Sequence, residues 1–506
     1  MTIRNKIGFW LALPIFILIL LLPFPESLSS QGQRTLAVAI LMAWWWITEA
    51  IPIPATALIP IVAFPLLKIL PIEKVVSSYG DSNIYLFMGG FLIAITMQRW
   101  ELHRRIALQI IRIIGISPRR IILGFMVATA LLSMWISNTA TTMMMYPIGL
   151  AIILHINELL LKEKHVEGEN GNFETVLMLG IAYSASIGGI GTLIGTPPNI
   201  VFAAAIKSIF PNAPEIGFLK WTMVGFPLVV MFIPLTWIIL TRIVLPVKIK
   251  SVPGGKEVIA SQLKELGPMK KAEKYTLIIF ILTAIGWIFR QNIDFGFFTI
   301  PGWSNLLGLQ DYVNDATVAI CSAVLLFLIP VDFKKKEFLL NWDWAIRIPW
   351  GILILFGGGI ALAGAFKSSG LAAWIGSNLD LFSHVPFLVM IMITCFMLTF
   401  LTEVTSNTAT ATIFMPILAA TALAMKIHPF LLMIPATISA SCAFMLPVAT
   451  PPNAIIFGSG AVTIPQMAKA GFALNFVGII LVTIITYLIA IPVFGIVLGT
   501  LPAWIK

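Results

Sequence analysis

Long runs of nearly uncharged residues recur along the whole of this 506-residue chain, those at 176–208 and 349–382 among them, and hydropathy also gives a span at 84–116. A run of about 18 or more such residues can cross the ~30 Å hydrocarbon core of a bilayer as a helix. Only 11% of the residues are charged, whereas roughly 25% are charged in an average soluble domain. We therefore predict an all-α polytopic membrane protein with about 11 transmembrane helices and, as argued below, two re-entrant hairpins.

Lysine and arginine gather in a few connecting segments. Residues 99–120 hold six Arg against one Glu, and residues 248–274 hold seven Lys against three Glu. Such clusters mark cytoplasmic loops, whereas residues 290–312, with one Arg and two Asp, indicate an external loop. The net charge of +10 is therefore explained by the orientation of the chain in a cell membrane. We predict no nucleic-acid partner. We expect the N-terminus to be cytoplasmic and the C-terminus external.

Three sequence blocks occur twice, in the same order. The pairs are "LFMGGFLIA" (86–94) with "ILFGGGIAL" (354–362), Ser137-Asn138-Thr139 with Ser406-Asn407-Thr408, and "GTPPN" (195–199) with "ATPPN" (449–453). Internal repetition of this kind indicates two similar structural halves. We place these halves at roughly 35–247 and 275–504, with polar connectors at 162–175, 248–274 and 292–312.

The charges of matched loops indicate how the halves are related. The loop after the first Gly-Gly block is rich in Arg, but its counterpart at 367–386 holds only Lys367, Asp380 and His384. Since positive charge marks the cytoplasmic side, the two loops should lie on opposite sides of the membrane. This predicts an inverted-topology repeat, a common construction in secondary transporters.

Two polar motifs interrupt apolar runs and predict helix breaks inside the membrane. In each Thr-Pro-Pro-Asn motif the prolines remove two N–H donors and stop a helix. The same letters fit a helix start, with Thr as N-cap and Pro at the first helical position. Each Ser-Asn-Thr block likewise precedes a helical run, so it predicts the tip of a re-entrant hairpin. The expected elements are re-entrant hairpins at 121–160 and 386–428 and broken helices at 176–208 and 430–460.

These four breaks would place four helix N-termini near the middle of the membrane. Each N-terminus carries a partial positive charge and free N–H groups, which suit a small anion. Small polar residues and prolines also serve plain packing and kinking in membrane helices. The duplication of both motifs at matching positions favours a binding site over that alternative.

Charged side chains do not supply the counter-charge for such an anion. No Lys, Arg or His occurs in residues 121–154, 181–206 or 429–468. Hydroxyls, Asn carbonyls and unwound backbone carbonyls are hard oxygen donors, and unwound segments of transporters commonly hold Na⁺. We therefore expect a co-transported Na⁺ beside each Ser-Asn-Thr block and no organic cofactor.

Enzymatic chemistry finds no support in the sequence. HExxH, GxSxG and His/Asp clusters are missing from it, so we predict that the protein is not an enzyme. Glu49 and Glu403 stand in apolar surroundings, where an acid is a functional candidate. The sequence leaves open whether each binds a ligand or makes a structural hydrogen bond.

At these motifs the chain resembles the divalent anion/sodium symporter family, and its bacterial sodium/dicarboxylate symporters in particular. The resemblance covers essentially the whole chain and also includes "WWWITEAIP" (44–52) and "FGGGIALA" (356–363). It implies a homodimer in which a transport domain moves as an elevator against a scaffold domain. The implied parts are scaffold at 1–120 and 275–385, transport domain at 121–247 and 386–506, and a cytoplasmic connector at 248–274.

The resemblance also implies the site residues. One sodium site would be formed by Ser133, Ser137, Asn138 and the backbone of Gly195, and the other by Thr402, Ser406, Asn407 and the backbone of Ala449. The substrate would be bound by Asn138, Thr139, Asn407 and Thr408, with Pro197 and Pro451 lining the site.

The function expected on these grounds is sodium-coupled symport of C4-dicarboxylates such as succinate, malate and fumarate. The alternative is a sodium-independent dicarboxylate/2-oxoglutarate exchanger on the same fold. The sequence leaves open the choice among dicarboxylate, citrate and sulfate, and the number of sodium ions per cycle.

Overall fold

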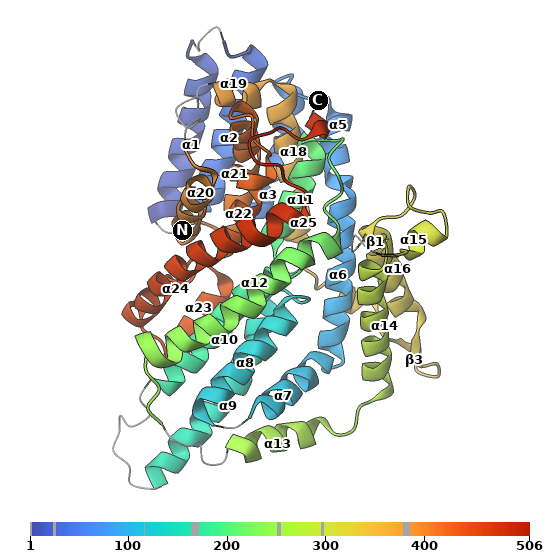
Figure 1. The fold of residues 1–506 in the computed structure, drawn as a ribbon, viewed down its shortest axis with the longest axis vertical. Helices are drawn as coiled ribbons and strands as arrows, with labels where there is room; N and C mark the ends of the chain where they lie inside the picture. The colour runs from blue at the N-terminus through green and yellow to red at the C-terminus, as the bar shows by residue number, and fades with distance from the viewer. Residues whose placement is uncertain are drawn as a thin grey trace.

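The computed structural model describes residues 3–23, 27–115, 117–162, 172–249, 255–294, 298–377 and 385–505. Most of the mixed-charge connector at 162–175 lies outside these residues, as do Asp380 and His384. The described chain is mainly helical. Figure 1 shows a slanted group of helices that includes α8, α10, α12 and α24, and an upright helix, α6, that separates this group from α14 and α16.

The N-terminal part consists of two long helices followed by short ones. These are α1 (Ile3–Leu21), α2 (Ser30–Thr48), α3 (Ile53–Thr56), α4 (Ile59–Leu66), α5 (Ile72–Ser77) and a 3₁₀ turn at Ser78–Gly80. Helices α1 and α2 pack side by side.

Two series of seven helices follow the same order in the two halves. The first series is α6 (Ser82–Arg99), α7 (Leu102–Ile114), α8 (Pro118–Ser133), α9 (Asn138–Lys162), α10 (Phe173–Gly189), α11 (Pro197–Ile209) and α12 (Phe218–Ile238). The second is α18 (Trp350–Ser368), α19 (Leu371–Ser377), α20 (Phe387–Thr402), α21 (Asn407–Ala424), α22 (Phe430–Ser439), α23 (Pro451–Gly458) and α24 (Ile464–Ile485). Both α12 and α24 continue into π-helical segments, at Ile239–Val244 and Thr486–Ala490.

The segment between the two series contains the strands. Its elements are α13 (Gly255–Leu266), α14 (Lys271–Ile288), β1 (Ile293–Asp294), β2 (Thr299–Ile300), α15 (Trp303–Leu306), α16 (Asp315–Leu328), β3 (Pro330–Asp332), β4 (Glu337–Phe338) and α17 (Trp342–Ala345). The strands pair as two antiparallel hairpins, β1 with β2 and β3 with β4. The chain ends with α25 (Ile491–Val493) and a 3₁₀ turn at Ala503–Ile505. Hydropathy does not predict these β-hairpins, because each strand has only two or three residues.

Left-handed residues divide the two apolar runs that the sequence presents as single spans. The first run is split into α6 and α7 at Glu101, with φ 57°, and the second into α18 and α19 beside Gly370, with φ 75°. The single-span expectation is therefore wrong for both. The reason is that hydropathy does not register a change of backbone direction: α7 has apolar residues on one face and four basic residues along its length.

The duplicated Gly-Gly blocks serve close helix packing. A methyl group at Gly89 of α6 would lie 2.6 Å from the backbone of Ala319 in α16, and one at Gly358 of α18 would lie 2.4 Å from the carbonyl oxygen of Ala57. Real Cβ atoms do not approach other atoms so closely. These glycines bring α6 and α18 against their neighbours, as small residues do in membrane helix interfaces.

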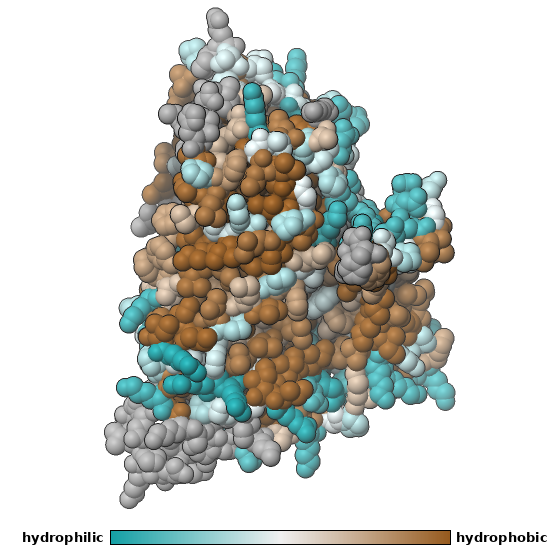
Figure 2. All heavy atoms as spheres, viewed as in Figure 1, coloured by the Kyte–Doolittle hydropathy of each residue, from teal (hydrophilic) through white to brown (hydrophobic). Residues whose placement is uncertain are grey.

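Apolar side chains cover much of the outer surface. Along α24 the exposed residues recur every fourth position, at Phe472, Phe476, Ile480 and Ile484, and Figure 2 shows apolar residues over much of the face on which α12 and α24 lie. Such a surface suits lipid. Within the described residues, four helices are long and apolar enough to cross a membrane: Phe218–Val244, Trp350–Ser368, Asn407–Ala424 and Ile464–Val493. The total of about 11 spans stays a prediction.

Candidate cation and anion site

The first Ser-Asn-Thr block lies in the turn between α8 and α9. Ser133 is fully buried at the end of α8, and its Oγ lies 2.7 Å from Oδ1 of Asn138 and 2.7 Å from the carbonyl oxygen of Ala185 in α10. A hydroxyl carries one proton, so it donates to only one of these two oxygens at a time. Within this cluster of three oxygens, one of the two acceptors therefore receives no hydrogen bond from Ser133.

The segment between α10 and α11 approaches the same cluster. A methyl group at Gly189 would lie 2.5 Å from Oδ1 of Asn138 and 3.1 Å from the carbonyl oxygen of Gly195. Only a residue without Cβ allows the Asn138 amide and the Gly195 carbonyl to lie so close to the backbone of Gly189. Of the four residues expected at the first sodium site, Ser133 and Asn138 are therefore in direct contact, and Asn138 and Gly195 both lie against Gly189. Ser137 is half-buried, and its Oγ accepts a 3.3 Å hydrogen bond from the N–H of Ala140 at the start of α9.

The second half repeats this oxygen cluster. Oγ1 of Thr402, at the end of α20, lies 2.7 Å from Oδ1 of Asn407 and 3.0 Å from the carbonyl oxygen of Ala440. Again one hydroxyl proton faces two acceptor oxygens. The other two residues expected here are less closely tied to the cluster: Ser406 is half-buried at the N-cap of α21, and Ala449 is buried with its N–H donating to the Leu446 carbonyl.

Both broken helices restart at proline. Helix α10 ends at Gly189 and α11 begins at Pro197, while α22 ends at Ser439 and α23 begins at Pro451. The first-turn prolines agree with the sequence expectation, because their missing N–H groups would have no intrahelical partner there. The capping threonines differ from each other. Both threonines stand at the N-cap with extended backbone, as the motif predicts. Thr450 Oγ1 accepts from the N–H of Asn453 at 3.3 Å, whereas the Thr196 side chain accepts no capping hydrogen bond among the described residues.

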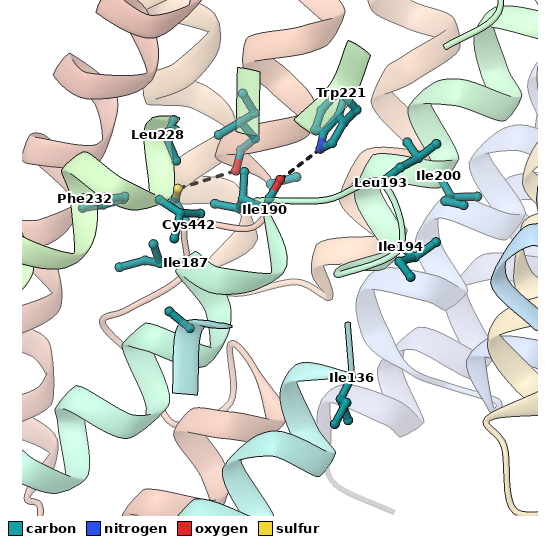
Figure 3. Packing of buried hydrophobic residues seen from close by; sticks show 14 of the residues in the cluster. Ile136, Ile187, Ile190, Leu193, Ile194, Ile200, Trp221, Leu228, Phe232 and Cys442 are labelled. Atoms are coloured by element: carbon teal, nitrogen blue, oxygen red, sulfur yellow. Dashed lines mark hydrogen bonds between the residues drawn. The ribbon is translucent and has the colours of Figure 1, made fainter. Parts of the chain in front are cut away.

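Apolar side chains surround the first unwound segment. Figure 3 shows Ile190, Leu193 and Ile194 in this packing, together with Trp221 of α12. The indole N–H of Trp221 donates to the carbonyl oxygen of Ile190 at 2.9 Å. The break therefore lies inside protein, as non-helical backbone at membrane depth requires.

Glu403 holds the second unwound segment in place. Its carboxylate accepts hydrogen bonds from the backbone N–H groups of Phe444 (2.7 Å), Met445 (2.9 and 3.0 Å) and Leu446 (3.2 Å). The amide of Asn475 in α24 donates to the same carboxylate at 2.8 Å. The Glu403 carboxylate thus accepts from four donor groups and is only 3% exposed. Of the two roles left open by the sequence, ligand binding and a structural hydrogen bond, the structure favours the second. It ties the turn after α20 to the segment after α22 and to α24.

Glu49 has a different position. It is the left-handed residue that ends α2, with φ 50°, and its side chain is exposed. Its carbonyl oxygen accepts a 2.8 Å hydrogen bond from Asn5. A left-handed residue commonly terminates a helix in this way, so Glu49 serves as a helix end at the surface.

The residues expected to bind the substrate are accessible. Asn138, Thr139, Asn407 and Thr408 are half-buried, Pro197 is half-buried, and Pro451 is exposed. Their helices are interleaved: α9 of the first half packs against α23 of the second, and α21 packs against α11. Each hairpin thus contacts the broken helix of the other half.

Two sizeable cavities lie away from these residues. The larger one, of about 300 Å³, is beside Lys207, Glu215 and Asn314, and a second, of about 230 Å³, is beside Arg290. None of the predicted site residues lines either cavity. A void of about 10 Å³ separates α11, α18 and α21.

The donor chemistry of the two clusters points to a hard monovalent cation. The oxygens are hydroxyl, amide and backbone carbonyl groups, and the described residues contain no group of three or more His, Cys, Asp or Glu side chains that could hold a metal. Neutral oxygens of this kind, contributed partly by unwound backbone, are typical of Na⁺ sites in transporters.

Comparison with known proteins agrees with this chemistry. The family model for the sodium:sulfate symporter transmembrane region matches residues 4–500. The chain is 46% identical over 498 residues to the sodium-dependent dicarboxylate transporter SdcS of Staphylococcus saprophyticus, covering 98% of this chain and 93% of that protein. It is 47% identical over 492 residues to SdcS of Staphylococcus aureus strain MRSA252, covering 97% and 92%.

One solved structure is similar in fold. The YdaH transporter of Alcanivorax borkumensis superimposes with a TM-score of 0.54 at 12% sequence identity, covering 90% of this chain and 98% of that one. At this identity the likeness concerns the fold alone. It places the helices described above within a membrane transporter architecture.

Proposed function

Because the chain belongs to the sodium:sulfate symporter family, whose members are transporters and not enzymes, we propose that it couples inward Na⁺ movement to uptake of C4-dicarboxylates. The proposed substrates are succinate, malate and fumarate. The similarity to SdcS supports both the coupling ion and the substrate class, since SdcS is named for sodium dependence and dicarboxylates.

The duplicated oxygen cluster carries this proposal. In each half a buried hydroxyl faces two acceptor oxygens with a single proton between them. A cation placed among these oxygens compensates for the missing hydrogen bond, because all three oxygens then direct lone pairs at a positive charge. One Na⁺ would occupy each cluster. In the first half its proposed ligands are Ser133, Ser137, Asn138 and the backbone of Gly195, beside the Ala185 carbonyl of the cluster. In the second half they are Thr402, Ser406, Asn407 and the backbone of Ala449, beside the Ala440 carbonyl.

Two bound cations would neutralise a dianion at a site without Lys, Arg or His. The carboxylates would bind between the hairpins, to Asn138 and Thr139 on one side and Asn407 and Thr408 on the other. The N-termini of α9, α11, α21 and α23 add partial positive charge. Since Asn138 and Asn407 would serve both ions, cation binding orients the amides that the substrate then contacts.

Transport would follow an elevator movement of residues 121–247 and 386–506 against a scaffold of 1–120 and 275–385 in a homodimer. The interleaved packing of α9 with α23 and α21 with α11 supports one part of this proposal. It ties the two sequence-distant parts of the transport domain into a single body, so that the complete site can move as a unit.

Uptake of radiolabelled succinate into proteoliposomes tests the proposal. Vesicles are prepared empty or preloaded with unlabelled succinate or 2-oxoglutarate, each with and without an inward Na⁺ gradient. The proposal predicts accumulation in empty vesicles only when the Na⁺ gradient is present. Uptake only into preloaded vesicles, with or without Na⁺, would instead establish an exchanger.

A further inference from the structure

The asparagine that closes each Thr-Pro-Pro-Asn motif binds the unwound segment before it. Asn199 is fully buried in the first turn of α11. Its side-chain amide Nδ2 lies 3.2 Å from the carbonyl oxygen of Gly189 and 2.7 Å from that of Thr192. One amide group, with two N–H donors, thus bridges the end of α10 and the middle of the segment that follows it.

The second half contains the same arrangement. Nδ2 of the fully buried Asn453 lies 3.1 Å from the carbonyl oxygens of both Ala443 and Leu446. The three residues of each set match at one offset, since 453 − 199, 443 − 189 and 446 − 192 all equal 254. The contact is therefore a feature of the repeat.

Backbone physics explains why such a donor is needed. The last carbonyl groups of a helix have no intrahelical partner, and in a membrane protein water is not at hand to satisfy them. Carbonyl groups of an unwound segment also lack an intrahelical partner. Asn199 donates to the last carbonyl of α10 and to that of Thr192 in the segment after it, and Asn453 donates to two carbonyls of the segment after α22. Its own Oδ1 is buried without a hydrogen-bond partner among the described residues, in both halves. The side chain is thus oriented for donation, at the cost of an unsatisfied acceptor.

The carbonyls that Asn199 holds belong to the backbone that shapes the first oxygen cluster. The Asn138 amide and the Gly195 carbonyl both lie against Gly189, in the space that a Cβ would fill. A rotation of the Gly189 peptide would therefore change the spacing of these oxygens. Asn199 is fully buried, and among the described residues its side chain forms hydrogen bonds only with backbone carbonyls of this segment, so its influence on the cation would act through this backbone.

We propose that Asn199 and Asn453 are positioning residues, each of which holds the unwound backbone of its own half in the geometry that binds a cation. This inference rests on the proposed function of the two clusters. It predicts that each asparagine affects only the cation cluster of its own half. Loss of either one would weaken Na⁺ binding while leaving the substrate contacts themselves in place.

The two halves should differ in their dependence on the asparagine. The second segment is also held through its N–H groups by Glu403, and Thr450 accepts from the N–H of Asn453. The first segment is anchored by two further hydrogen bonds between neutral groups: the indole N–H of Trp221 donates to the Ile190 carbonyl, and Oγ1 of Thr192 donates to the Met134 carbonyl. It has no counterpart of the Glu403 carboxylate among the described residues. Substitution of Asn199 should therefore weaken Na⁺ binding more than substitution of Asn453.

Na⁺-dependent thermal stabilisation of the purified full-length protein measures binding without transport. We compare Asn199→Ala, Asn453→Ala and, as a control, Thr437→Val, which removes a buried hydroxyl that donates within its own helix. Removal of two hydrogen bonds predicts a roughly tenfold rise in half-saturating Na⁺ for Asn199→Ala. A smaller rise is expected for Asn453→Ala and none for Thr437→Val. In uptake assays, saturating Na⁺ should restore the succinate KM of both asparagine variants.

Double substitutions separate positioning from general destabilisation. Ser133→Ala combined with Asn199→Ala should weaken the free energy of Na⁺ binding by less than the sum of the two single substitutions, because both act on the first cluster. Ser133→Ala combined with Asn453→Ala should be additive. If Asn199→Ala does not fold, Asn199→Ser keeps one donor and should give an intermediate shift.

Two results would overturn the inference while leaving the proposed function intact. One is an unchanged Na⁺ midpoint in Asn199→Ala or Asn199→Ser. The other is additivity in both double variants, which would show that the asparagines stabilise the fold without acting on a particular cluster. Absence of any Na⁺-dependent stabilisation in the unsubstituted protein would instead overturn the proposed function, and the inference with it.

Discussion

Substitution of Gly189 by alanine tests the first oxygen cluster directly. The added methyl group would lie 2.5 Å from Oδ1 and 3.1 Å from Nδ2 of Asn138, and 3.1 Å from the carbonyl oxygen of Gly195. The first of these distances is too short for any Cβ, so the Asn138 amide must move away from the cluster. Loss of a hydrogen bond or ligand contact to a charged group costs about 1.5–3 kcal/mol. The expected rise in half-saturating Na⁺ is therefore about 10- to 100-fold.

The same substitution should leave the fold intact. Gly189 ends α10 and is not among the glycines with positive φ, so alanine fits its backbone conformation, and alanine is favoured over glycine in a helix by roughly 0.5–1 kcal/mol. Thermal unfolding in Na⁺-free buffer should therefore be close to that of the unsubstituted protein, while the Na⁺ dependence of succinate uptake shifts strongly.

A second glycine of the same helix provides the control. A methyl group at Gly180 would lie 3.1 Å from Cγ of Met126, a flexible side chain that can adjust. Gly180→Ala should keep the original Na⁺ dependence. If Gly189→Ala transports succinate with unchanged half-saturating Na⁺, Asn138 and Gly195 do not form a cation site, and the assignment of the first cluster is refuted.

Three further substitutions test other parts of the site and fold. Asn138→Ala should raise the half-saturating concentrations of both Na⁺ and succinate in uptake assays, and a change in the succinate value alone would contradict its double role. Glu403→Gln replaces a charged acceptor of several N–H groups and should lower unfolding stability by about 1.5–3 kcal/mol, measured by thermal unfolding; an unchanged midpoint would refute the structural role. Arg290→Met leaves the carboxylate of Asp315, now 2.6 Å from the guanidinium, buried and unpaired, and should destabilise the protein by about 3–5 kcal/mol; stability within 1 kcal/mol or so of the original would show that this ion pair is not buried in solution.

The parts of the fold that follow from local chemistry could be predicted from sequence. Proline lacks an N–H group whatever surrounds it, so the restarts of α11 at Pro197 and α23 at Pro451 were expected from the motifs. Apolar runs identify helices because lipid and protein interior both exclude charge.

Features that depend on backbone direction could not be predicted in this way. The changes of direction at Glu101 and Gly370 need a left-handed residue, but Glu has no special tendency towards that conformation. Hydropathy also gives no signal for the short β-hairpins, because their strands have only two or three residues.

The residues that hold the unwound segments in place were the least predictable part of the site. The sequence predicted the asparagines of the Ser-Asn-Thr blocks as ligands but gave no role to Asn199 or Asn453, because their partners are backbone carbonyls that carry no side-chain signal. The matching offset of the repeat was the available clue. The role of Glu403 likewise depends on N–H groups about forty residues away in sequence, which only the folded chain brings near.

The ratio of sodium to substrate in one transport cycle tests the central claim most directly. Uptake of ²²Na⁺ and radiolabelled succinate is measured in the same proteoliposomes, with a Na⁺ gradient and no preloaded substrate. One cation in each duplicated cluster predicts at least two Na⁺ ions for every succinate. Succinate accumulation with one Na⁺ or none per molecule would contradict a cation site in each half.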